Sequence, residues 1–211
     1  MQTRSEAEEH LRVIRSLMEK ATIYRAISAP TALVGGVTSV VVGAALAIKM
    51  SGQSATPEGS LRVLFLAGWL GVLAVTAAAN TVFLWRDARR RGDVFVSAGM
   101  RAAVLAFSPS YLTAAFFTVL FAPGSLPSMW MIFYGLGLLA TQHFAPRSIA
   151  LLGWAFLAAG MLVVVLELTS LVDGIRNANL SMIATFGLFH LIYAACTWPR
   201  KSAGVAAGGT P

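Results

Sequence analysis

The stretch VLFLAGWLGVLAVTAAANTVFLW, residues Val63–Trp85, runs directly into RDARRR, residues 86–91, and this junction decides the fold. The apolar stretch has no charged residue, whereas arginines dominate the six residues that follow it. A bilayer core is ~30 Å thick, and an α-helix that rises ~1.5 Å per residue crosses it in about 20 residues. The stretch therefore predicts a membrane-spanning helix with basic residues at one end.

The rest of the 211-residue chain has the same character. Hydrophobic residues make up 57% of it and charged residues only 12%, and its mean hydropathy is +0.72. A soluble domain carries about 25% charged residues, so this chain has too few to cover a surface that faces water. The formal net charge of +7 comes from basic residues that flank apolar spans. This favours a lipid bilayer over nucleic acid as the partner, and we expect no direct nucleic-acid binding.

We predict an all-α polytopic membrane protein with about six transmembrane helices, because backbone groups in lipid must be satisfied within each helix. The expected spans are Ala26–Ile48, Val63–Trp85, Gly99–Phe121, Ser128–Thr141, Ser148–Leu168 and Leu180–Trp198. The fourth is the weakest, and it could gain length from Leu126 and Phe144 at its ends. We expect three segments: a cytoplasmic amphipathic helix in 1–25, the six-helix domain in 26–198 and a disordered cytoplasmic tail in 199–211.

The distribution of lysine and arginine predicts the orientation. With six spans, 13 of these residues lie on the side of the two termini and three lie on the other side. The positive-inside rule then places both termini in the cytoplasm of a bacterial inner membrane. The segment Ser51–Ser60 is an external loop in this topology. The short connection Ala122–Leu126 predicts that the third and fourth spans are antiparallel neighbours.

The N-terminal segment Ser5–Tyr24 has the pattern of an amphipathic helix. Its apolar face carries five residues: Leu11, Ile14, Leu17, Met18 and Ala21. Such a helix can lie on the inner membrane surface. It can also dock onto a cytoplasmic protein partner or a second copy of the chain.

Small residues recur every fourth position in the first span, where Gly36 and Gly43 are the candidate packing residues. In the second span, Ala67 is followed by Gly71 and Ala74 by Ala78. Small residues at this spacing let membrane helices approach closely. Packing within the bundle is the expected use, and a dimer interface is the alternative.

His190 is the candidate functional residue because it lies near the middle of the last span. Charging an imidazole at that depth is costly, so we expect a neutral ring. It either donates one interhelical hydrogen bond or takes part in proton transfer or ligand binding. The polar residues expected to accompany it are Tyr193, Tyr111, Ser108, Ser110 and Asn80. The two serines flank Pro109, and they can bond carbonyl groups that the proline leaves without a donor.

No phosphate-binding loop, paired metal-binding histidines, cysteine pair or nucleophile elbow occurs in the sequence. We therefore expect no catalytic residues, no metal and no cofactor. The leading hypothesis is a non-enzymatic membrane protein that assembles with a partner or signals to it. The alternative is a small transporter or channel with its polar site near His190. A membrane enzyme or cofactor carrier ranks third.

Three stretches carry a resemblance: Leu11–Glu19 before the first span, Phe144–Ser148 with Leu152–Trp154, and Thr185–His190. Together they resemble a family of small bacterial membrane proteins whose function is uncharacterised. Members of that family are often encoded beside winged-helix transcriptional regulators. The resemblance implies a membrane partner or sensor role, and it provides no catalytic residues.

Overall fold

The computed structural model describes residues 8–14, 28–51, 58–92, 95–96, 98–143, 145–169 and 174–198. These residues form helices and the short connections between them, with no strand in the described ranges. Besides a helical segment at 8–14, the helices in chain order are α2 (Ala29–Ser51), α3 (Glu58–Arg91), α4 (Ala98–Leu120), α5 (Leu126–Ala140), α6 (Arg147–Leu168), α7 (Gly174–Met182), the π-helix η1 (Ile183–Phe189) and α8 (His190–Thr197).

The predicted all-helical fold is therefore confirmed for the described residues. Five helices are long and apolar enough to cross a membrane, with α7, η1 and α8 together forming the fifth. The shorter α5 has 15 residues and includes Leu126 as expected. Phe144, the tail 199–211 and most of the predicted N-terminal helix lie outside the described residues.

Two predicted boundaries are wrong. The loop expected over Ser51–Ser60 is shorter, because α2 includes Ser51 and α3 begins at Glu58. The last helix begins at Gly174 instead of Leu180, so its first turns include polar residues that hydropathy alone excludes. One of them, Asn179, is fully buried, and its amide is hydrogen-bonded inside the bundle.

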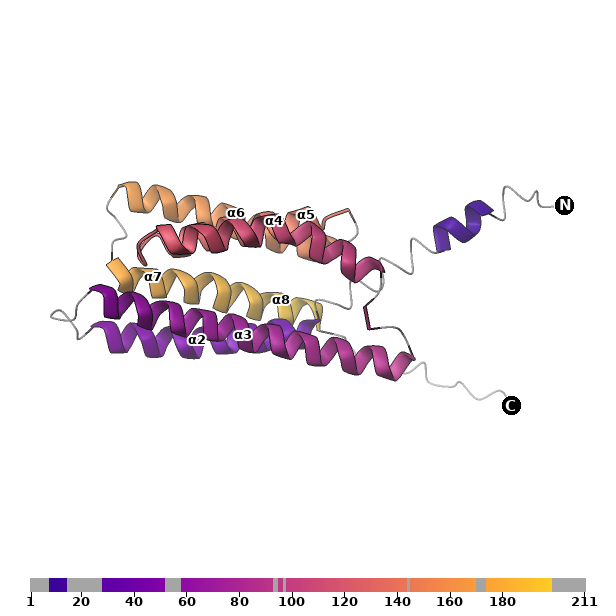
Figure 1. The fold of residues 1–211 in the computed structure, drawn as a ribbon, viewed down its shortest axis with the longest axis horizontal. Helices are drawn as coiled ribbons and strands as arrows, with labels where there is room; N and C mark the ends of the chain where they lie inside the picture. The colour runs from indigo at the N-terminus through magenta and orange to yellow at the C-terminus, as the bar shows by residue number, and fades with distance from the viewer. Residues whose placement is uncertain are drawn as a thin grey trace, which may run out of the picture.

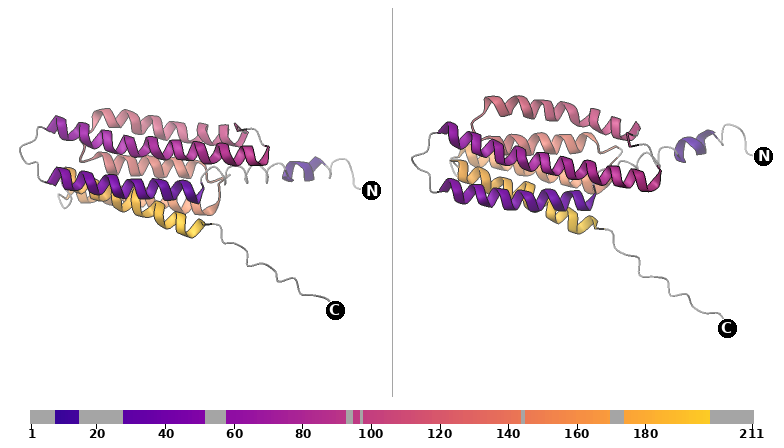
Figure 2. Two further views of the ribbon diagram at one scale, coloured as in Figure 1. Left: turned by 90° about the horizontal axis from the view of Figure 1, so that it is seen from below. Right: turned by 60° about the horizontal axis from the view of Figure 1, so that its bottom comes forward.

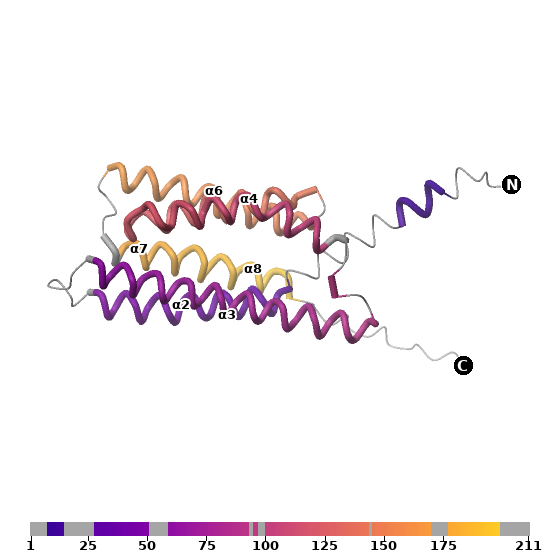
Figure 3. Tube along the Cα trace, viewed as in Figure 1, coloured from indigo at the N-terminus to yellow at the C-terminus, as the bar shows by residue number. Residues whose placement is uncertain are grey.

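The helices run along one long axis in the arrangement of Figure 1. α4, α5 and α6 form one group, α2 and α3 form another, and α7–η1–α8 lies between them. α2 packs along the last helix through all three of its parts, whereas α4 packs chiefly on α5. Figure 3 follows the chain through this order, and Figure 2 shows that the end of α3 extends past the end of α8. The last helix thus packs most closely on α2.

Local chemistry determines where two helices begin and end. Ser28 precedes α2, and its Oγ accepts a hydrogen bond from the Thr31 backbone N–H at 3.4 Å. Pro30 occupies the first turn, where a missing N–H costs nothing. At the end of α3, Gly92 adopts a φ of 71°, a left-handed conformation that glycine reaches without strain.

Pro109 lies inside α4 without ending the helix. Its ring nitrogen has no hydrogen to donate to the carbonyl of Leu105, four residues earlier. The Ser108 hydroxyl donates to that carbonyl at 2.9 Å. The prediction that a flanking serine bonds the freed carbonyl is confirmed, and Ser108 is thereby engaged within its own helix.

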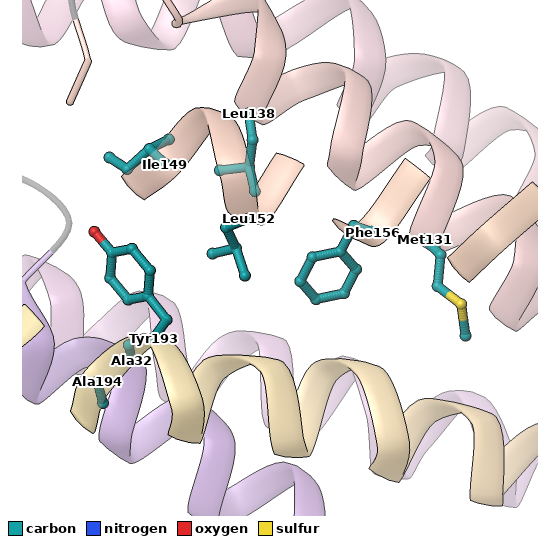
Figure 4. Packing of buried hydrophobic residues seen from close by; sticks show 8 residues of the cluster. All are labelled: Ala32, Met131, Leu138, Ile149, Leu152, Phe156, Tyr193 and Ala194. Atoms are coloured by element: carbon teal, nitrogen blue, oxygen red, sulfur yellow. The ribbon is translucent and has the colours of Figure 1, made fainter. Parts of the chain in front are cut away.

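Two clusters of buried residues form the core. The first consists of Ala32, Met131, Leu138, Ile149, Leu152, Phe156, Tyr193 and Ala194. Figure 4 shows its α5 and α6 side chains facing those of α8 and α2. The second lies toward the α2–α3 connection and consists of Leu46, Met50, Phe65, Trp69, Val72, Leu126, Ala178 and Met182.

Glycines allow the closest helix contacts. A Cβ atom added at Gly135 of α5 would lie 2.7 Å from the Gly153 carbonyl oxygen and 2.8 Å from the Leu157 backbone nitrogen. Gly36 of α2 lies against Leu191 and the carbonyl of Gly187, and Gly43 lies against Ile183. Gly36 and Gly43 therefore pack within the bundle, against the last helix.

The outer surface of the bundle is apolar. No described side chain of α4 is buried, and its exposed residues include Val104, Leu105, Leu112 and Phe116. α3 likewise exposes Val63, Leu70 and Leu73, among others. Such continuous apolar faces are unfavourable in water and are usual on helices surrounded by lipid. Composition and surface together suggest that the bundle is embedded in a membrane.

Gly135 and Gly71 provide a matched test of the packing. A Cβ at Gly71 would meet no atom within 4 Å, whereas one at Gly135 would collide with backbone atoms of α6. We expect Gly135→Ala to destabilise the protein by about 1–3 kcal/mol and Gly71→Ala to change stability by less than about 0.5 kcal/mol. Thermal unfolding of both variants in mild detergent measures the difference. Equal stability of the two variants would contradict the packing of α5 on α6.

Candidate functional site at His190

The side chain of His190 is hydrogen-bonded at both ring nitrogens. Nδ1 lies 2.8 Å from the Phe186 carbonyl oxygen, and Nε2 lies 2.8 Å from the Tyr134 hydroxyl. A carbonyl can only accept, so Nδ1 carries the proton. In a neutral ring, Nε2 is then the acceptor, and the Tyr134 hydroxyl donates to it. This assignment gives both polar groups a partner without any charge, as apolar surroundings favour.

The helix widens where it carries this histidine. The π-helix η1 covers Ile183–Phe189, and His190 begins the α-helix that follows. The backbone N–H of His190 donates to the Gly187 carbonyl, whereas its side chain donates to the Phe186 carbonyl. In an α-helix the backbone N–H of His190 would bond to Phe186. Because the helix type changes here, the Phe186 carbonyl does not accept the His190 backbone N–H, and the imidazole of His190 donates to it instead.

Aromatic rings surround the pair. Tyr134 meets Phe156 edge to face at a centroid distance of 4.7 Å, and Phe186 lies 4.8 Å from Phe156. The Phe186 and His190 rings stack at 6.2 Å, and Phe189 meets Phe156 at 5.3 Å. Edge-to-face and offset contacts of this kind stabilise cores beyond the burial of area. The five rings, Tyr134, Phe156, Phe186, Phe189 and His190, link α5 and α6 to the last helix, and we call them the aromatic cluster.

Two of the other predicted site residues, Tyr193 and Tyr111, lie in or beside the first core cluster, against which Tyr134 also packs. Tyr193 is buried one turn further along α8, in the first core cluster. Tyr111 meets Phe107 edge to face at 5.7 Å, and Phe107 packs against that cluster. Ser110 lies beside Gly137 of α5: a Cβ atom added at Gly137 would be 3.5 Å from the Cβ atom of Ser110.

The remaining predicted residues bond elsewhere. Asn80 of α3 accepts a hydrogen bond from the Thr31 hydroxyl of α2 at 3.2 Å. Ser108 bonds its own helix, as described above. Among the described contacts, no hydrogen bond or ring contact joins Asn80, Ser108 or Ser110 to His190. The six predicted site residues therefore do not form one polar site. Asn80, Ser108 and Ser110 make their described contacts away from His190.

A second set of polar contacts lies toward the connection between α2 and α3. The Trp69 indole N–H donates to Asn179 Oδ1 at 3.0 Å, and Asn179 Nδ2 lies 3.3 Å from the sulfur of Met50. These contacts join α3, α7 and α2. Asn179 is fully buried, so its amide must find partners inside the protein.

The same end of the bundle joins α3 to α4. The Arg62 guanidinium donates to the carbonyls of Thr118 and Val119 at 3.1 and 2.9 Å. These carbonyls lie in the last turn of α4, where a cation is favoured by the helix dipole. The Trp130 indole of α5 donates to the Thr118 hydroxyl at 2.8 Å. Arg62 thus caps a neighbouring helix.

Glu167 lies near the end of α6. Its Oε2 accepts a hydrogen bond from the buried Ser128 hydroxyl of α5 at 3.1 Å. Across the described residues, no three histidine, cysteine, aspartate or glutamate side chains lie close enough to hold a metal ion together. The Ser128–Glu167 bond thus adds a polar link between α5 and α6.

Sequence reasoning missed the partly buried Tyr134 and the buried Asn179 as hydrogen-bonding residues. A signal for the first was present. Tyr134 lies in the middle of the fourth predicted span, and a phenol in apolar surroundings needs a partner. His190 was the ionisable side chain predicted at a similar depth. Asn179 carried no such signal, because hydropathy placed it outside the last span.

Comparison with known proteins provides no relative from which a function could be transferred. No family model matches the chain, and no curated protein or solved structure shows significant similarity to it. The functional argument consequently depends on the residues and contacts described above.

Three single variants and one double variant test the role of the His190–Tyr134 hydrogen bond. We expect His190→Leu and Tyr134→Phe each to lower stability on the order of 1 kcal/mol, because interhelical hydrogen bonds between membrane helices are weak on average. His190→Gln should lose less, since an amide can still bond Phe186 or Tyr134. Thermal unfolding of the single variants and of the double variant His190→Leu/Tyr134→Phe measures the coupling. Additive losses in the double variant would show that the two residues are not coupled.

Proposed function

We propose that this protein is a six-span bacterial inner-membrane protein that assembles with a partner or signals to it, without catalysing a reaction. In this proposal α5 is the sixth span, and both termini lie in the cytoplasm. The resemblance of the sequence to a family encoded beside transcriptional regulators supports a cytoplasmic protein as the partner. A second copy of the chain is the other candidate.

The alternation of the helices supports the six-span topology. The exposed arginines Arg86, Arg89, Arg90, Arg101 and Arg147 belong to the end of the bundle where α3 stops and α4 and α6 begin. Lys49 and Arg62 belong to the opposite end. This asymmetry follows the positive-inside rule when the arginine-rich end is cytoplasmic. α5 is about 22 Å long at 1.5 Å per residue, so a crossing requires local thinning of the bilayer or extension by flanking residues.

The observation that carries the partner role is the exposed apolar face of the helical segment at 8–14. Leu11 and Ile14 are three residues apart, on one face of the helix, and they are 66% and 52% exposed. Glu8, Glu9 and Arg12 give the same helix a charged surface. An amphipathic helix of this kind binds either a protein groove or a membrane surface. Charged residues of both signs on the polar side favour the protein groove.

A specific observation favours transport as the second candidate function. The π-helix η1 ends at His190, and π-helical segments inside α-helices frequently occur at functional sites. In this candidate function, His190 exchanges its hydrogen bonds during a transport cycle. The variant His190→Gln distinguishes the two functions. Unchanged stability with loss of a measured flux in proteoliposomes would favour transport over the structural role.

The topology can be tested with reporter fusions. A reporter fused after Pro211 should be active on the cytoplasmic side, and one inserted in the Ser51–Ser60 loop should be active on the other side, because 13 basic residues lie on the first side and three on the second. Six spans place five of them, an odd number, between the two reporters, so reporters on the same side would require an even number. The short α5 would then be the first helix to reconsider.

The partner role can be tested by deleting Met1–Lys20. We expect the bundle to remain inserted and folded, because each spanning helix satisfies its own backbone, and we expect the co-purified partner to be lost. The variant Leu11→Ser/Ile14→Ser should have the same effect, and Glu9→Gln is the matched control on the polar face. Purification from the native host in mild detergent, followed by quantitative proteomics, gives the measurement. Retention of every partner by the truncated protein would reduce this helix to a membrane anchor.

A further inference from the structure

The last two turns of α3 carry a dense basic patch. Arg86, Arg89, Arg90 and Arg91 are all exposed, and Asp87 between them is partly buried. Ala88 is buried at 7% exposure, so the opposite side of the helix is covered, and the arginines point outward. Figure 2 shows this part of α3 extending beyond α2, the helix on which α3 packs. The patch therefore lies at the edge of the bundle and is open to its surroundings.

Helix geometry gives the depth of this patch in a bilayer. The apolar part of α3, Val63–Trp85, is about 34 Å long at 1.5 Å per residue, which matches a hydrocarbon core of ~30 Å. The following six residues rise about 9 Å. The polar headgroup region adds about 5–8 Å on each side of the core. The arginines consequently lie at the depth of the phospholipid phosphates.

Two neighbouring features are typical of an interface with lipid headgroups. The Arg89 guanidinium lies 4.2 Å from the ring centroid of Trp85, and tryptophan is enriched at this depth. This contact fixes the guanidinium plane while its N–H groups remain able to donate. After the helix ends, Phe95 and Val96 are exposed apolar residues, as expected for a connection that touches the membrane surface.

We propose that Arg86, Arg89 and Arg90, with Trp85, form a binding site for the phosphate groups of anionic phospholipids. Guanidinium groups pair with phosphate oxygens through two parallel hydrogen bonds. Phosphatidylcholine binds them less strongly than an anionic lipid, because the positive charge of its choline group repels arginine. Basic residues next to a membrane-spanning helix attract anionic lipids. This proposal rests on the membrane insertion proposed above. It goes further by naming anionic phospholipids as the lipids that the protein binds preferentially.

The test compares variants with equal loss of charge. The full-length protein is placed in phosphatidylcholine nanodiscs to establish insertion. It is then equilibrated in detergent with equal amounts of phosphatidylglycerol and phosphatidylcholine that carry the same acyl chains. Mass spectrometry of the lipids retained after purification gives their ratio. Arg86→Gln/Arg90→Gln is the test variant, and Arg101→Gln/Arg147→Gln removes the same charge from the same end of the bundle.

We expect the wild type and the Arg101→Gln/Arg147→Gln control to retain phosphatidylglycerol preferentially. Arg86→Gln/Arg90→Gln should lower that preference on the order of 10-fold, and Arg86→Lys/Arg90→Lys should keep only the part that depends on charge, because lysine cannot form the paired hydrogen bonds. Thermal unfolding in phosphatidylcholine confirms that each variant is folded. Equal loss in both glutamine variants would overturn the site, since it would indicate general surface charge. Displacement of the lipid by millimolar inorganic phosphate would also overturn it. Failure to enter the nanodisc would instead contradict membrane insertion.

Discussion

Close contact between helix backbones at glycine is the constraint on which this bundle depends. Helices in lipid gain little from hydrophobic burial, so they associate through van der Waals packing and hydrogen bonds. Gly135 of α5 and Gly153 of α6 let the two backbones approach until a single methyl group would collide. Gly137, two residues along α5, lies against Phe107 of α4. The shortest apolar helix thereby holds a longer one on each side.

The position of α5 also determines where the polar contacts form. Tyr134 is adjacent to Gly135, so the close approach to α6 leaves the phenol pointing toward the last helix and His190. The last helix is held on its other side by α2, where Gly36 meets Gly187. Gly187 belongs to η1, so this segment contacts α2 through Gly36 and Gly187 on one side. On the other side, the His190 that follows it is hydrogen-bonded to Tyr134 of α5. The widened turn supplies the Phe186 carbonyl to His190.

The sequence was sufficient to predict the helices and insufficient to predict how they group. Apolar length identified each long helix, and the short Ala122–Leu126 connection correctly predicted that α4 and α5 are neighbours. The grouping of α2 and α3 with the last helix depends on contacts between residues more than a hundred positions apart, such as Trp69 with Asn179. Periodicity contains no information on such pairs. The π-helix was likewise invisible, because its sequence, IATFGLF, reads as an ordinary apolar helix.

The two ends of the bundle differ in how their polar side chains are used. At the end with Arg62, the polar side chains bond one another or neighbouring backbone: Arg62 caps α4, and Trp69 bonds Asn179. These bonds tie α3 to α4 and to α7. At the other end, the arginines of α3 are exposed and α3 extends past α8. Arginines held at the surface with their donors outward can bind acidic groups with little reorganisation. The lipid site proposed for Arg86, Arg89 and Arg90 therefore lies at the end where the described arginines are exposed.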